Sequence, residues 1–283
     1  MSIRSLAYLC VLLMMASSAK GYSQEEADSP SSAKTANISP DARLIIDQYI
    51  SATGGREAWQ NLESVQGNGT VSIPAASISG TAEFCITPGT YRNTFNMSGG
   101  KVQDATIITG RNGDVAWQLT GESDKYQGKI LEGVERLKSL RKYQFNQMLD
   151  LDANFLSVEL AALEEVNGKP AYKLDMVPRE SPDSTETRYF DQASHLIVRT
   201  VIEGGGPIQE SFYDDYVQVG PVKMHTKTKR MASGVVLMEI NMTNLLVNKP
   251  FPDSYKQMPY EIRVLLGEET VSPPGGKKTP DGK

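Results

Sequence analysis

Few residues of this chain have the types and spacing that catalysis requires. The candidates are the paired acids Asp214 and Asp215 and the chain's two histidines, His195 and His225. Neighbouring residues of a strand point to opposite faces of a sheet, so the two acids are not expected to share one site. Two histidines without a third ligand do not complete a metal site. With no nucleophile elbow, phosphate loop or zinc motif, the sequence predicts a protein that is not an enzyme and needs no cofactor.

Composition narrows the class of protein further. The 283 residues are 39% hydrophobic and 22% charged, with a mean hydropathy of −0.35, values that are typical of a globular chain. The net charge of −5 argues against a nucleic-acid partner. The two cysteines, Cys10 and Cys85, are too few for a disulfide scaffold.

The first residues are typical of an export signal. Arg4 precedes an apolar run over residues 6–16, and small residues follow this run. The run is shorter than the roughly 20 residues that a membrane-spanning helix needs. The alternative to a cleaved signal peptide is an uncleaved N-terminal anchor. Cys10 lies inside the run rather than after small residues at its end, which argues against lipidation. We expect a signal peptide over residues 1–21, cleaved within residues 19–23, and a periplasmic location.

Two polar segments flank the part of the chain that can fold. Residues 22–39 are rich in Ser, Ala and Glu, and residues 267–283 are rich in Pro, Gly and Lys. Neither segment can bury enough apolar surface to offset its ordering entropy, so both are predicted to be a disordered linker and tail. One domain is expected over residues 40–266.

That domain opens with helix signals and continues as strands. Ser39 and Pro40 predict a helix start and Gly54-Gly55 its end, and a second, short helix is expected over residues 56–62. Apolar residues then alternate with polar ones in about a dozen short runs separated by turns. We expect a mainly β, α+β fold with one large curved antiparallel sheet that forms an incomplete barrel.

A helical insert is predicted over residues 130–151, between two sets of strands. Apolar residues recur there at helical spacing, while Arg136 and Arg141 are expected to face solvent. The insert is positioned to close the concave face of the sheet as a lid.

One later strand is strongly basic. Its charged residues alternate between the two faces of the strand. This pattern favours a solvated edge strand, whose charges discourage pairing with another sheet. The alternative is contact with anionic lipid or a membrane partner. The charged residues are Lys223, Lys227, Lys229 and Arg230.

The order of these elements resembles the LolA/LolB-like family of outer-membrane lipoprotein-sorting proteins. Residues 88–92 (PGTYR) are similar to a strand start of that family, and residues 110–117 (GRNGDVAW) are similar to its hairpin. Residues 189–199 are similar to its later strand pair, and residues 248–259 to its closing segment. The resemblance spans residues 41–260.

The resemblance implies a half-open, LolA-like barrel with an N-terminal helix, a helical lid and an apolar interior. It also implies a soluble, monomeric periplasmic carrier that moves lipoprotein acyl chains or lipids from an inner-membrane donor to an outer-membrane acceptor. Acyl chains cost about 0.8 kcal/mol per CH₂ in water, so a carrier must offer a dry site. An arginine that latches the family's lid is replaced here by Thr87. The alternative is an envelope sensor or structural module of the same fold that binds a protein partner.

The lining of such an interior is predicted from alternating apolar residues of the strands and from apolar positions of the insert. Methionine suits a lining that accepts varied chains, and Met224, Met231, Met238 and Met242 are further candidates. Ordinary core packing is the alternative for any one of these residues. The predicted lining residues are Val71, Ile73, Phe84, Ile86, Tyr91, Phe95, Met97, Trp117, Leu119, Leu137, Leu140 and Met148.

Overall fold

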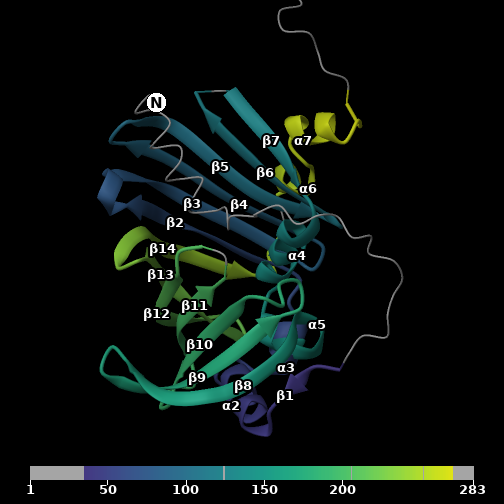
Figure 1. Cartoon of the computed structure of the whole chain (residues 1–283). Coiled ribbons are helices and arrows are strands. Elements are labelled where there is room, and N and C mark those ends of the chain that lie inside the picture. The colour runs from purple at the N-terminus through teal and green to yellow at the C-terminus, as the bar shows by residue number, and fades with distance from the viewer. Residues whose placement is uncertain (1–34, 124, 205, 251, 270–283) are drawn as a thin grey trace, which may run out of the picture.

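A computed structural model describes residues 35–123, 125–204, 206–250 and 252–269, which form one large sheet with helices on both faces (Figure 1). The predicted signal peptide and most of the two polar flanking segments lie outside the described residues. The strands are β1 (Asn37–Ile38), β2 (Val65–Ile73), β3 (Ile78–Thr87), β4 (Thr90–Gly99), β5 (Val102–Asn112), β6 (Val115–Glu122), β7 (Lys125–Leu131), β8 (Phe155–Val166), β9 (Lys169–Pro178), β10 (Thr185–Asp191), β11 (Ile197–Glu203), β12 (Gln209–Val219), β13 (Val222–Ala232) and β14 (Val235–Val247). The helical segments are α2 (Pro40–Ala52), α3 (Arg56–Gln60), η1 (Pro74–Ala76), α4 (Gly133–Lys142), η2 (Gln147–Leu149), α5 (Leu151–Asn154), α6 (Asp253–Lys256) and α7 (Tyr260–Leu265).

The strands pair in one 14-stranded sheet, in the order β1-β8-β9-β10-β11-β12-β13-β14-β2-β3-β4-β5-β6-β7. Every pair is antiparallel except β1 with β8, and the two end strands, β1 and β7, do not pair with each other. The prediction of a mainly β fold with one large, unclosed antiparallel sheet is therefore confirmed. Because β14 pairs with β2, the C-terminal meander joins the N-terminal one in a single surface.

The N-terminal helix begins where the sequence predicts. Ser39 precedes α2, and its side-chain oxygen accepts a hydrogen bond from the backbone N–H of Ala42 at 3.3 Å. The residues just before it correct the predicted disorder of residues 22–39, because β1 pairs in parallel with β8. The Ser39 N–H also donates to the Val158 carbonyl at 3.0 Å. Backbone pairing with β8 thus orders the end of a segment whose composition alone predicts disorder.

The two faces of the sheet carry different helices. We call the face that carries α2, α3 and α4 the inner face, and the face that carries α6 and α7 the outer face. Tyr91 of β4 lies on the inner face, since its hydroxyl is 3.0 Å from that of Ser139 in α4. The next residue, Arg92, lies on the outer face, with its guanidinium carbon 4.8 Å from the ring centroid of Tyr255 in α6. Directly paired residues of neighbouring strands share a face, so the register extends this assignment across the sheet.

The predicted helical insert is confirmed in position but starts later and is broken into pieces. Ile130 still belongs to β7, and α4 begins at Gly133, whose φ of 51° lies in the left-handed region that favours glycine. After α4 the chain continues through η2 and α5 into β8. The insert therefore connects β7, one end strand of the sheet, to β8, which lies next to the other end strand.

Two predicted lining residues, Trp117 and Leu119, lie on the outer face, which corrects their assignment to the interior. They share a face with Arg92 through the register of β4, β5 and β6, and they pack with Ile262 of α7. The inner position next to them is occupied by Ala116. Period-two alternation shows which residues share a face, but it cannot show that short C-terminal helices cover that face.

The C-terminal tail is also ordered at its start, contrary to the prediction for residues 267–283. The Glu268 N–H donates to the Arg263 carbonyl at 2.9 Å, and the Arg263 side chain pairs with Glu269. These contacts form a turn that follows α7 and fold the next residues back onto its last turn. Hydrogen bonds at a helix end can order a segment that has no core of its own.

Replacing Trp117 with alanine should lower the free energy of unfolding by about 3–5 kcal/mol, because the ring is buried against α7 and lies over the backbone of Gly110. The exposed Tyr126 of β7 is the matched control, and its replacement with alanine should cost less than about 1 kcal/mol. Denaturant titration of the two variants measures both losses. Equal losses would mean that α7 does not cover Trp117.

Candidate functional site

The inner face carries an apolar cluster that consists of strand residues. Val102, Ile240 and Met242 are partly buried against its fully buried members. By contrast, α2 contributes to the apolar cluster over β8, β9 and β10, and α3 contributes Trp59 to the cluster next to it. The buried members, which together with the three partly buried residues we call the inner apolar cluster, are Val71, Ile73, Ile78, Ala82, Phe95, Met97, Ile107 and Met238.

Most of the lining residues predicted in strands lie on this face. Four of them are members of the inner apolar cluster, and the other three lie beside it, toward α3 and α4. The structure therefore brings together a continuous set from β2, β3 and β4, and excludes Trp117 and Leu119. The predicted residues on the inner face are Val71, Ile73, Phe84, Ile86, Tyr91, Phe95 and Met97.

The predicted residues of the insert do not form one continuous apolar lid face. Leu137 is 44% exposed and Val134 is also exposed, so this side of α4 faces solvent. Leu140 is partly buried. Met148 lies after α4, in η2, and is buried in the cluster that α2 forms with β8. The side of α4 that faces the sheet carries Ser139 instead. The prediction that Leu137 faces the interior is therefore wrong.

Sequence reasoning named Met238 and Met242 of β14 as candidates but missed Ile240, which lies between them. Ile240 pairs with Val71 and Met242 pairs with Gly69, so both side chains lie on the inner face. Met238, two residues before Ile240, completes this row within the inner apolar cluster. Apolar residues occupy both faces of β14, so alternation gives no signal there. The methionines were the one available signal, and two of the four named candidates belong to the cluster.

Aromatic packing joins α4 to the sheet. Tyr143, the residue after α4, stacks on Tyr91 with ring centroids 3.6 Å apart, and its hydroxyl lies 3.4 Å from that of Thr109. Burial raises the pKa of Tyr91, so its hydroxyl stays protonated and can bond Ser139. These contacts hold the C-terminal end of α4 over β4 and β5.

A buried ion network holds the same end of α4 to the other half of the sheet. Arg141 donates from Nε to Glu180 and from Nη1 to Glu186, each at 2.9 Å, and Arg188 of β10 also pairs with Glu186. Burial alone would raise the pKa of Glu186, but Arg188 and Arg141 outweigh it and hold that pKa below its usual value. The expectation that Arg141 faces solvent is therefore wrong: its side chain is 13% exposed, compared with 36% for Arg136.

The candidate catalytic residues do not assemble into a site. Asp214 and Asp215 are both exposed, and Asp215 has a φ of 52° and pairs with Lys227 at 2.6 Å. His225 instead packs against two tyrosines, and burial together with the charge of Arg230 lowers its pKa to about 4. No group of three or more potential metal ligands occurs within the described parts of the chain.

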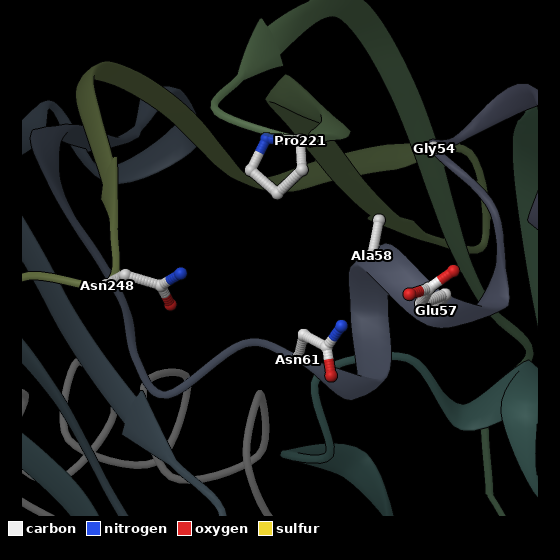
Figure 2. Close-up of a pocket in the computed structure, with 6 residues that line it drawn as sticks. All are labelled: Gly54, Glu57, Ala58, Asn61, Pro221 and Asn248. Atoms are coloured by element: carbon white, nitrogen blue, oxygen red, sulfur yellow. The ribbon is translucent and has the colours of Figure 1, made fainter.

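A separate surface hollow of about 350 Å³ lies beside α3 (Figure 2). More of its lining is polar than apolar, so it suits an acyl chain less well than the inner apolar cluster does. This hollow is distinct from the inner apolar cluster. Its lining residues are Gly54, Glu57, Ala58, Asn61, Pro221 and Asn248.

Comparison with solved structures shows that the fold is LolA-like. A domain from Vibrio parahaemolyticus that is assigned to outer membrane lipoprotein sorting has a TM-score of 0.52 and 9% sequence identity, with 76% of this chain and 95% of that chain covered. A LolA superfamily protein from Nitrosomonas europaea has a TM-score of 0.50 and 12% identity, with 77% and 97% covered. Neither a protein-family model nor a curated protein matches the sequence. Among the helices that the structure describes, none is long and apolar enough to cross a membrane.

Arg141→Met should lower the free energy of unfolding at pH 7 by about 3–5 kcal/mol, because the buried Glu186 then loses one of its two arginine partners. The difference from the unaltered protein should narrow below about pH 4, where carboxyl groups take up protons. The reason is that the pKa of Glu186 is lowered on folding, so its stabilising effect is present at neutral pH and lost as the pH falls. Urea titration across this range measures the effect.

The matched control is Arg136→Met on the same helix, whose half-exposed arginine lies 3.7 Å from Asp114. It should cost less than about 1 kcal/mol at any of these pH values. A loss for Arg141→Met that is no larger than for Arg136→Met would contradict the structural role of the ion network.

Proposed function

We propose that this protein is a periplasmic carrier that binds acyl chains of lipids or lipoproteins on the inner apolar cluster and transfers them toward the outer membrane. The observation that carries the proposal is this cluster itself. Strands alone supply its residues, and Ile240 and Met242 are only partly buried within it. Apolar side chains that keep accessible surface on the inner face of an unclosed sheet suit an apolar guest. The LolA-like fold agrees with this assignment.

The energy of transfer supports a dry binding surface. Each buried CH₂ contributes about 0.8 kcal/mol, so a dozen methylenes supply roughly 10 kcal/mol. Methionines at positions 238 and 242 add flexible, polarizable side chains that adapt to chains of different shape.

Transfer also requires contact with a donor and an acceptor. The solvent side of α4 carries Val134 and Leu137, both exposed and less than one turn apart. Exposed apolar side chains of this kind are typical of surfaces that contact another protein or a membrane. We propose that this side of α4 contacts the inner-membrane donor or the outer-membrane acceptor. The export signal predicted over residues 1–21 gives the protein access to both.

Replacing Ile240 with aspartate should weaken binding of a fluorescent fatty-acyl probe at least about tenfold, because a carboxylate is strongly disfavoured beside a bound alkyl chain. The matched control is Leu246→Asp on the same strand, since Leu246 pairs with Gln66 on the outer face and is already exposed. Leu246→Asp should bind the probe as the unaltered protein does. Circular dichroism confirms that each variant keeps its sheet.

A second variant guards against a folding defect at this position. Ile240→Trp adds volume without charge, so it should also displace the probe while preserving the apolar character of the face. If the folded variants bind the probe as well as the unaltered protein, the inner apolar cluster is not the binding surface. If the unaltered protein does not bind the probe at all, the carrier proposal fails and the protein-binding alternative takes its place.

A further inference from the structure

The hollow beside α3 lies where three segments far apart in the sequence meet. Its lining residues come from residues 54–61, which include α3, from the turn between β12 and β13, and from the residue that follows β14. The side chain of Asn248 and the ring of Pro221 point into the space that α3 borders (Figure 2). The hollow is thus a junction of distant parts of the fold, apart from the inner apolar cluster.

The hollow lies at the end of the sheet where two neighbouring strands part. β13 pairs with β12 from Val222 to Ala232, but with β14 only from Lys227 to Ala232. This pairing on both sides corrects the prediction that the basic residues of β13 mark a solvated edge strand. Toward the hollow, the described residues of β13 and β14 no longer pair, and Trp59 of α3 packs with Val222 of β13 and Val247 of β14. The helix α3 therefore occupies the place where the two strands separate.

Backbone contacts hold the walls of the hollow in place. The Lys223 N–H donates to the Thr53 carbonyl at 2.9 Å, which fixes β13 to the loop before α3. Gly54 has a φ of 120° and lies so close to the same turn that a Cβ would be 2.4 Å from the Pro221 carbonyl oxygen. On the opposite side, the Asn248 N–H donates at 2.9 Å to the carbonyl of the residue before β2. A site whose walls are already fixed loses little conformational entropy when a ligand binds.

Two side-chain amides and one carboxylate line these walls. The Asn248 Oδ1 accepts a hydrogen bond from the Glu63 N–H at 2.9 Å, so the Asn248 amide nitrogen is left to donate elsewhere. Asn61 and Glu57 are exposed, and neither side chain has a protein partner among the residues that the structure describes. Arg56, which precedes Glu57, donates instead to a carbonyl of η2 at 2.8 Å. The hollow thus presents hydrogen-bond donors and acceptors that the described chain does not use.

This set of groups selects among ligand classes. None of the lining residues is cationic, so a phosphate or carboxylate finds no counter-charge there. An amine would use the Glu57 carboxylate but not the amide N–H groups. A hydroxyl group both donates and accepts hydrogen bonds, so neighbouring hydroxyls use an amide and a carboxylate together. Ala58 and the Pro221 ring add apolar contact for the C–H groups of a sugar ring, and the volume of about 350 Å³ lies in the range of small-molecule sites.

We propose that the hollow beside α3 binds a saccharide, with the hydroxyls of one pyranose ring bonded to Glu57, Asn61 and Asn248. This site does not depend on the proposed carrier function, because it lies apart from the inner apolar cluster. A free saccharide and the headgroup of a glycolipid are the two sources of such a ring.

The test titrates nitrogen-15-labelled protein with methyl β-D-glucopyranoside and with N-acetylglucosamine, and follows the side-chain amide signals of Asn61 and Asn248 by NMR. At least one sugar should shift both signals, with a dissociation constant of about 1 mM or lower. Tetrahydropyran-2-methanol, which has the ring without its vicinal hydroxyls, should bind at least about tenfold more weakly. The double variant E57A/N61A should also weaken binding of the sugar at least about tenfold. The matched control Q60A, which alters an exposed residue of α3 outside the hollow, should bind as the unaltered protein does.

Octyl β-D-glucopyranoside, used below its micellar concentration, distinguishes the two sources of the ring. A dissociation constant at least about tenfold lower than for the methyl glycoside assigns the site to a glycolipid headgroup, and equal constants assign it to a free saccharide. If neither side-chain amide signal shifts at about 50 mM of either sugar, the saccharide site is overturned. Equal binding by E57A/N61A and the unaltered protein overturns it as well. Both results leave the carrier proposal intact, and the backbone NMR signals show whether each variant keeps its fold.

Discussion

An unclosed curved sheet has an apolar inner face that must be covered, and this constraint organises the rest of the molecule. The end strands β1 and β7 do not pair with each other, so the sheet cannot bury its inner face by closing into a full barrel. The helix α2 covers the part formed by β8, β9 and β10, and α3 covers the neighbouring part. Between them and α4, the strands β2 to β5 and β14 contribute the inner apolar cluster without a helix. The carrier function that we propose uses this middle part of the face.

The insert between β7 and β8 depends on two different kinds of contact. On one side, Tyr143 stacks on Tyr91, a contact that tolerates some sliding. On the other side, Arg141 reaches Glu180 and Glu186 in a buried ion network, whose geometry is specific. In the family that this chain resembles, an arginine at the position of Thr87 latches the lid. Here the Thr87 side chain instead forms hydrogen bonds with the backbone of its own β-hairpin. In this chain the arginine that holds the insert lies on the insert itself.

The architecture was readable from the sequence because local signals decide it. Period-two alternation and turn residues predict the strands, and Ser39 with Pro40 predicts the start of α2. Alternation alone cannot tell the two faces of the sheet apart, because it marks both faces in the same way. The C-terminal helices that cover the outer face are too short to be recognised from the sequence. For this reason alternation predicts an interior position for Trp117 and Leu119, although α7 covers them on the outer face.

The charged residues of the insert escape prediction from the sequence for a related reason. On a helical projection Arg136 and Arg141 flank the predicted apolar positions on opposite sides, and only the position of β10 shows that Arg141 meets Glu186. Likewise, the basic run of β13 predicts an edge strand, and only the register shows that β13 pairs with both β12 and β14. Contacts between residues far apart in the sequence thus determine the candidate site, whereas local signals determine the elements that carry it.

The central claim is that the inner face holds an acyl chain, and native mass spectrometry of the protein purified from its own cell envelope tests it most directly. If the inner face holds an acyl chain, a population of the protein should exceed the mass of the polypeptide by one lipid and should lose this extra mass on unfolding. A protein that always has the mass of the polypeptide alone, even after incubation with envelope lipids, would contradict the account.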